Sequence, residues 1–177
     1  MSGPKVSVSV CVRNGAHWIE GCLEALLNQT YPNIEILVVN DGSDDGAEAI
    51  LSPYHDPEGE RGFPLTVHHQ PPLGLSAGRQ WAVEQASGEW VAITDIDVRP
   101  EQDWVANMVA NIQPLSEEER VVAVTGRTVF EQANDLVSRL RSVEIAAKYR
   151  ARPRRTSLAN GPCSMFHREA LMEVGGF

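Results

Sequence analysis

The segment VAITDIDVRP, residues 91–100, joins a short apolar run to two aspartates, Asp95 and Asp97, that are one residue apart. The apolar residues before Asp95 predict a buried strand that ends at this point. A carboxylate is costly to bury without a partner, so the two side chains either face water or hold a cation. The rest of the sequence separates these two possibilities.

Apolar strands and amphipathic helices alternate on both sides of this segment. The pattern predicts strands at 6–12, 34–39, 65–69, 90–94 and 121–126. It predicts helices at 17–29, 47–51, 76–86, 103–113, 135–150 and 168–174. We therefore expect an α/β fold, with a mostly parallel, Rossmann-like sheet flanked by helices on both faces.

Polar motifs follow three of the predicted strands: Arg13–Asn14, Asn40–Ser43 and Asp95–Asp97. In parallel sheets, ligands bind outside the carboxyl ends of the strands. We expect the three motifs to meet at that edge, although up to 80 residues separate them.

The predicted edge collects carboxylates and has almost no His or Cys. Oxygen ligands suit Mg²⁺ or Mn²⁺, and Mg²⁺ typically combines one or two protein carboxylates with substrate phosphates. The sequence contains neither a G-x-G-x-x-G loop nor a Walker loop, so a glycine-rich phosphate cradle is not expected. The pattern favours a site for a divalent metal and a diphosphate.

The distribution of charge excludes one class of partner and leaves a second question open. The chain has 177 residues and a net charge of −9, so nothing in its overall charge favours nucleic acid. The stretch from Arg139 to Arg155, however, has seven basic residues and one acid. This stretch either meets an anion or forms a solvated helix face.

Cysteine usage and hydropathy favour a location in the cytoplasm, either free or at the inner face of a membrane. Cys11, Cys22 and Cys163 fit no metal spacing and are expected to be reduced thiols. The first residues do not resemble a signal peptide, and no run approaches the ~18 apolar residues of a membrane span. Membrane association through regions outside these residues stays open.

Four stretches together resemble the family 2 glycosyltransferases, which have the GT-A fold. These are VSVSVCVRN, LLNQTYPNIEILVVNDGSDDG, LGLSAGRQWAVEQASGEWVAITDID and GPCSMFHREALMEVGGF. The resemblance implies transfer of a sugar from a nucleotide-diphosphate donor, usually a UDP-sugar, with inversion and a divalent metal (Mn²⁺ or Mg²⁺). It implies an acceptor hydroxyl on a saccharide, a lipid-linked molecule or another compound.

The resemblance also assigns roles to individual residues. Asp97 is expected as the direct metal ligand, with Asp95 beside it, and Asp41 is expected to accept a hydrogen bond from uracil. The donor-binding set that it implies is Val12, Arg13, Asn14, Asp41, Ser43, Arg79, Asp95 and Ile96. Arg13 stands where the family has an aromatic residue; a guanidinium can also stack on a base, so the donor base stays open.

The resemblance implies a division of the chain and leaves the catalytic base unassigned. Residues 1–126 are expected to bind the nucleotide-sugar, and residues 127–177 to begin an incomplete acceptor-binding part. The family's base is expected beyond Phe177. A metal-dependent nucleotidyltransferase and an inactive nucleotide-sugar-binding domain remain alternatives. Trp18 and Trp81 are expected in the core.

Overall fold

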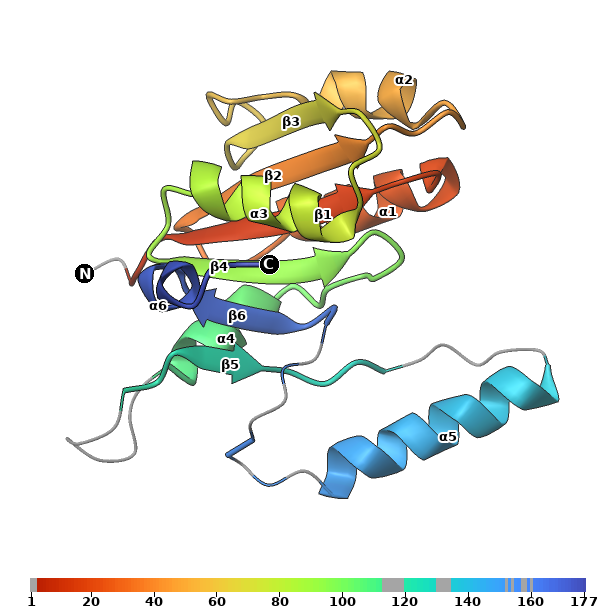
Figure 1. The fold of residues 1–177 in the computed structure, drawn as a ribbon, viewed down its shortest axis with the longest axis vertical. Helices are drawn as coiled ribbons and strands as arrows, with labels where there is room; N and C mark the ends of the chain where they lie inside the picture. The colour runs from red at the N-terminus through yellow and green to blue at the C-terminus, as the bar shows by residue number, and fades with distance from the viewer. Residues whose placement is uncertain are drawn as a thin grey trace.

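A computed structural model describes residues 3–112, 120–129, 135–151, 153, 155, 156, 159 and 161–177 (Figure 1). The strands are β1 (Val6–Val12), β2 (Ile34–Asp41), β3 (Leu65–Gln70), β4 (Trp90–Asp95), β5 (Ala123–Thr125) and β6 (Ser164–His167). The helices are α1 (Ala16–Leu27), α2 (Ala47–Leu51), α3 (Leu75–Gln85), α4 (Trp104–Ala110), α5 (Leu136–Ala151) and α6 (Arg168–Glu173), with a 3₁₀ turn at Ser52–Tyr54. Among the described helices, none is both long enough and apolar enough to cross a bilayer.

The six strands form one sheet in the order β3-β2-β1-β4-β6-β5. Strands β3, β2, β1 and β4 pair in parallel, and β6 pairs antiparallel with both β4 and β5. The predicted mostly parallel α/β sheet is therefore confirmed. The sequence pattern missed β6, which returns from the carboxyl-terminal part of the chain to lie between β4 and β5.

Helices cover both faces of the sheet. Side chains alternate between the two faces along each strand, so the apolar strands present apolar side chains on both faces. One core is formed by alternate strand positions and by helices α1, α2 and α4, with Ile19, Leu51 and Val105 among its members. The other core lies under α3 and α6 and includes Val83 and Leu171. Figure 1 shows α3 and α6 on the near face of the sheet.

Helix α3 lies very close to strands β1 and β2, and Gly78 makes this possible. A Cβ atom at Gly78 would lie 3.0 Å from the Cys11 sulfur and 3.3 Å from Cγ1 of Val39. A larger side chain at this position would therefore push the helix away from the strands. The close approach brings the next residue, Arg79, towards the end of β4.

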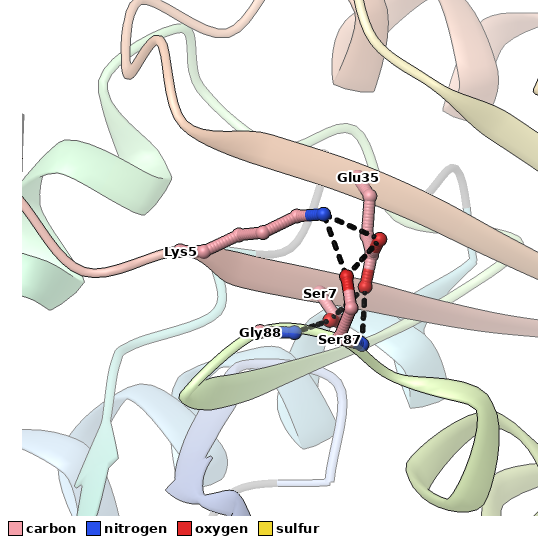
Figure 2. Close-up of polar contacts among 5 residues, drawn as sticks. All are labelled: Lys5, Ser7, Glu35, Ser87 and Gly88. Carbon is pink, nitrogen blue, oxygen red and sulfur yellow. Dashed lines mark hydrogen bonds and ion pairs between the residues drawn. The ribbon is translucent and has the colours of Figure 1, made fainter. Parts of the chain in front are cut away.

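Glu35 anchors the amino-terminal ends of three strands (Figure 2). Its carboxylate accepts hydrogen bonds from the Ser7 hydroxyl and from both the backbone and the hydroxyl of Ser87, and it pairs with Lys5 at 2.9 Å. Ser7 in turn accepts from the Gly88 amide. Burial would raise the pKa of Glu35, but these hydrogen bonds outweigh burial and lower it from 4.5 to about 2. The cluster lies at the end of the sheet opposite the polar motifs.

We predict that Glu35→Gln lowers the free energy of unfolding at neutral pH by about 1–3 kcal/mol, because the buried Ser7 hydroxyl and the donors of Ser87 and Lys5 lose their charged acceptor. The stabilisation from the carboxylate is complete above pH 4.5 and is lost as the pH falls from 4.5 towards 2. Urea unfolding of both proteins across this range should therefore show curves that converge in acid.

The matched control is Glu20→Gln, which changes an exposed glutamate on α1. It should unfold like the parent protein at every pH. A Glu35→Gln difference that stays constant down to pH 2 would show that the carboxylate charge does not stabilise this cluster.

Candidate functional site

The polar motifs that follow β1, β2 and β4 meet at the carboxyl edge of the sheet. The strand register pairs Cys11 with Asp95, and Val12 with Asn40. Asp41 pairs with Gln70 at the end of β3. The parallel order of these strands therefore places residues from distant parts of the chain at one edge, as the sequence predicts.

An open cleft of about 400 Å³ lies at this edge. Five of the residues expected to bind the donor or the metal line it: Arg13, Asn14, Asp95, Ile96 and Asp97. The lining also includes Cys11, Gly15, Trp18 and Leu75. Two carboxylates and one exposed guanidinium thus share the cleft with apolar side chains.

Arg79 contacts one of the two carboxylates. Its Nη2 donates to Oδ1 of Asp95 at 3.0 Å, and the Arg79 side chain is only 17% exposed. The side chain of Asp95 is 39% exposed. Arg79 therefore fixes the orientation of Asp95 from the α3 side while leaving part of the carboxylate open to the cleft.

Asp97 is exposed in the turn that follows β4. Within the residues that the structure describes, no group of three or more His, Cys, Asp or Glu side chains could hold a metal ion alone. Two cleft carboxylates fit a hard divalent cation that completes its shell with phosphate oxygens and water. The donor set is therefore suited to a metal that arrives with, or is shared with, a diphosphate.

The rim of the cleft consists of the loops after β1 and β2, which are hydrogen-bonded to each other. The Asn14 amide donates to Oγ of Ser43, and the Asp44 amide donates to Oδ1 of Asn14. The Ala16 amide donates to Oδ2 of Asp45. Ser43 thus supports the rim and lines a neighbouring hollow of about 540 Å³ rather than the main cleft.

Asp41 is 3% exposed and holds the loop that follows β3. Its Oδ1 accepts from Nε2 of Gln70 at 2.7 Å and from the Leu73 amide at 2.8 Å, and its Oδ2 accepts from the Gly74 amide at 2.9 Å. Burial would raise the pKa of Asp41, but these hydrogen bonds lower it below its ordinary value. Both carboxylate oxygens are therefore already engaged by the protein's own donors.

Two of the expected donor-binding residues, Val12 and Ile96, are apolar and pack against the rim at Gly15. Val12 is 1% exposed and belongs to the core. A Cβ atom at Gly15 would lie 3.2 Å from Cγ2 of Ile96 and 3.3 Å from Cγ2 of Val12. The rim loop therefore rests on these two side chains, and Val12 supports the cleft without lining it.

Trp18 is a cleft residue that the sequence analysis wrongly assigned to the core. Its side chain is 42% exposed, and the Arg99 guanidinium lies 5.8 Å from its ring centroid. The buried stripe of α1 runs through Ile19, Cys22, Leu23 and Leu26. Trp18 lies at the border of that stripe, and helical spacing alone does not show which side of the border faces the cleft.

Cys11 brings a thiol into the cleft, but its burial disfavours the ionised form. Burial raises the pKa of Cys11 to about 11, and the opposing effect of Arg79 is smaller. The thiolate, which is the reactive form, is therefore scarce.

Comparisons with known proteins agree with this arrangement. The sequence model described as Glycosyl transferase family 2 matches residues 7–175. Putative glycosyltransferase EpsH from Bacillus subtilis is 40% identical over 109 residues, which are 62% of this chain and 30% of EpsH. Uncharacterized glycosyltransferase EpsJ from the same organism is 33% identical over 134 residues, 75% of this chain and 36% of EpsJ.

Solved structures of similar fold include a mannosyltransferase and S. aureus TarS. The mannosyltransferase PcManGT from Pyrobaculum calidifontis, in complex with GDP-Man and Mn²⁺, is 30% identical with a TM-score of 0.74, over 99% of this chain and 48% of that one. S. aureus TarS in complex with UDP-GlcNAc is 22% identical with a TM-score of 0.67, over 96% of this chain and 47% of that one. The chain thus spans less than half of each of these four proteins, and it belongs to glycosyltransferase family 2 with a GT-A fold.

Proposed function

We propose that the cleft binds a nucleotide-diphosphate sugar with a divalent metal, and that the protein transfers the sugar to an acceptor hydroxyl with inversion. The observation that carries this proposal is the presence of Asp95, Asp97 and the Arg79 contact at one cleft edge. Family membership supports it. So does the mannosyltransferase neighbour, which is in complex with GDP-Man and Mn²⁺.

The two cleft carboxylates have different roles in this proposal. Asp97 is the direct metal ligand, because it is exposed and lines the cleft. Asp95 keeps one oxygen on Arg79 and offers the other to the metal or its water shell. A divalent cation held there, Mn²⁺ or Mg²⁺, would neutralise charge on the departing diphosphate.

The nucleoside end of the donor is assigned to the rim on the β2 side. Arg13 is exposed and lines the cleft, so its guanidinium plane can stack on a base. Asp41 orders the 70–74 loop, in which Leu73 is 65% exposed, and Leu75, which follows the loop, is 49% exposed. The family resemblance favours uridine and the mannosyltransferase neighbour favours guanosine, so a panel of nucleotide diphosphates decides between them.

The general base for inversion is not assigned to the cleft. In the described part of the chain, the acids that line it are Asp95 and Asp97, and both are committed to the metal and the diphosphate. We place the donor-binding part at residues 1–126 and the start of the acceptor-binding part at 127–177. The base then comes from another part of the protein, and the acceptor is a saccharide, a lipid-linked molecule or another hydroxyl compound.

We predict that Asp97→Ala abolishes the Mn²⁺ dependence of nucleotide-diphosphate binding and that Asp95→Ala weakens binding at least about tenfold, the loss expected for one charged contact. Calorimetry with UDP and with GDP, each with and without Mn²⁺, measures both effects. The preferred nucleotide should also raise the melting temperature of the parent protein, because binding to the native state stabilises it.

Asp103→Ala is the matched control, since Asp103 is an exposed aspartate that follows β4 along the chain but does not line the cleft. It should bind like the parent protein. Unchanged Mn²⁺-dependent affinity in Asp97→Ala would remove the metal assignment, and failure of every nucleotide diphosphate to bind would remove the proposed function.

We predict that Asp41→Ala frees the 70–74 loop and weakens nucleotide binding more than it weakens Mn²⁺–pyrophosphate binding. The Leu73 and Gly74 amides lose a charged acceptor, worth about 1.5–3 kcal/mol, so their hydrogen exchange should accelerate about tenfold or more. Exchange mass spectrometry and calorimetry measure the two effects.

Asp44→Ala serves as the control, because Asp44 is exposed in the neighbouring turn. It should leave exchange at Leu73 and Gly74 unchanged. Equal losses of nucleotide and pyrophosphate affinity in Asp41→Ala would show that this loop does not serve the base.

A further inference from the structure

Helix α5 presents large apolar side chains that nothing in the described chain covers. Leu136, Leu140 and Val143 are 71%, 62% and 69% exposed. None of the side chains of this helix is buried in the part of the protein that the structure describes. Figure 1 shows α5 standing apart from the sheet and from the helices that cover it.

Three of the large exposed apolar residues of α5 form one stripe together with Ala147, whereas Val137, which is 75% exposed, lies outside it. With 3.6 residues per turn, Leu136, Leu140, Val143 and Ala147 fall on the same side of the helix. The half-exposed residues at the same spacing, Ser138, Ser142, Ile145 and Tyr149, fall on the opposite side. The helix therefore has an outer apolar stripe and a distinct second face.

Basic side chains adjoin the apolar stripe on one side and lie farther round the helix on the other. By the same helical geometry, Arg139 and Arg150 lie along one border, whereas Glu144 and Val137 lie along the other, with Lys148 and Arg141 beyond them. Glu144 is the only acid of the helix, and it pairs with Lys148 at 2.7 Å. Four basic residues and one acid give α5 a charge of +3, whereas the whole chain carries −9.

This combination of apolar and basic side chains fits an anionic lipid surface better than it fits a nucleotide or a sugar phosphate. A nucleotide or a sugar phosphate would use the basic groups but not an apolar stripe. At a membrane, apolar side chains enter the acyl boundary while Lys and Arg extend their charged ends to the headgroups. Arg139 and Arg150 lie next to the stripe, where their side chains can make such contacts, and the local positive charge complements anionic headgroups.

We propose that α5 lies along the surface of a membrane that contains anionic lipids, with Leu136, Leu140 and Val143 in the acyl boundary. The helix lies on the bilayer and does not cross it. This inference does not depend on the proposed sugar transfer, because it uses no residue of the cleft. The proposed membrane-contacting surface is formed by residues of this chain.

Flotation of the 177-residue chain with vesicles tests the proposal. The protein should float with vesicles of equal parts phosphatidylcholine and phosphatidylglycerol, and should not float with phosphatidylcholine alone. Added salt should weaken the binding, because it screens the basic side chains. No flotation with either vesicle would overturn the proposal.

Two sets of variants test the apolar stripe and the basic residues of α5 separately. The double variant Leu140→Ser with Val143→Ser and the triple variant Arg139→Glu, Arg141→Glu and Arg150→Glu should each lower vesicle binding at least about tenfold. Folding should survive in both, because every substituted side chain is exposed. Circular dichroism confirms this.

Matched controls make the same chemical changes elsewhere. Val129→Ser with Val174→Ser removes two side chains that are 74% and 80% exposed, and Arg61→Glu, Arg120→Glu and Arg127→Glu change the net charge equally. Both controls should bind vesicles like the parent protein. If the controls and the α5 variants behave alike, or if the α5 variants alter only the oligomeric state or nucleotide affinity, the membrane assignment is wrong.

Discussion

The close packing of helix α3 on strands β1 and β2 determines where the polar groups of the cleft can lie. Gly78 allows this approach, because a Cβ atom there would meet Cys11 and Val39. The helix then carries Arg79 to within 3.0 Å of Asp95 at the end of β4. Without this approach, the guanidinium would not reach the carboxylate, and the cleft would lose the contact that orients one of its two acids.

The two ends of the sheet use carboxylates in opposite ways. At the amino-terminal end, Glu35 is surrounded by donors from the protein itself, and its charge stabilises the fold. At the carboxyl end, Asp97 is left exposed, so its charge is available to a ligand. Asp41 is intermediate, since it lies at the functional end but is already satisfied by the 70–74 loop. The number of internal donors around each carboxylate distinguishes a structural acid from a candidate ligand.

The sequence alone was sufficient to predict the features that depend on local periodicity. Apolar alternation predicted the parallel strands, and their shared direction predicted that Arg13, Asn14, Asp95 and Asp97 would meet. Strand β6 was missed because it has four residues and inserts antiparallel between β4 and β5, which no local pattern encodes. The partners of Asp41 were missed for a similar reason. They come from a loop about thirty residues away, and its path depends on tertiary packing.

The hydrogen bonds between the loops after β1 and β2 connect the two loops into one continuous rim of the cleft. Asn14, which has a left-handed φ of 53°, both donates to and accepts from the second loop, and Ala16 adds another bond to it. A rim ordered before the ligand arrives loses little conformational freedom on binding. The same bonds restrict how this cleft can be redesigned. A change of length in one loop would leave donors of the other without acceptors, so the two loops would have to be exchanged as a matched pair.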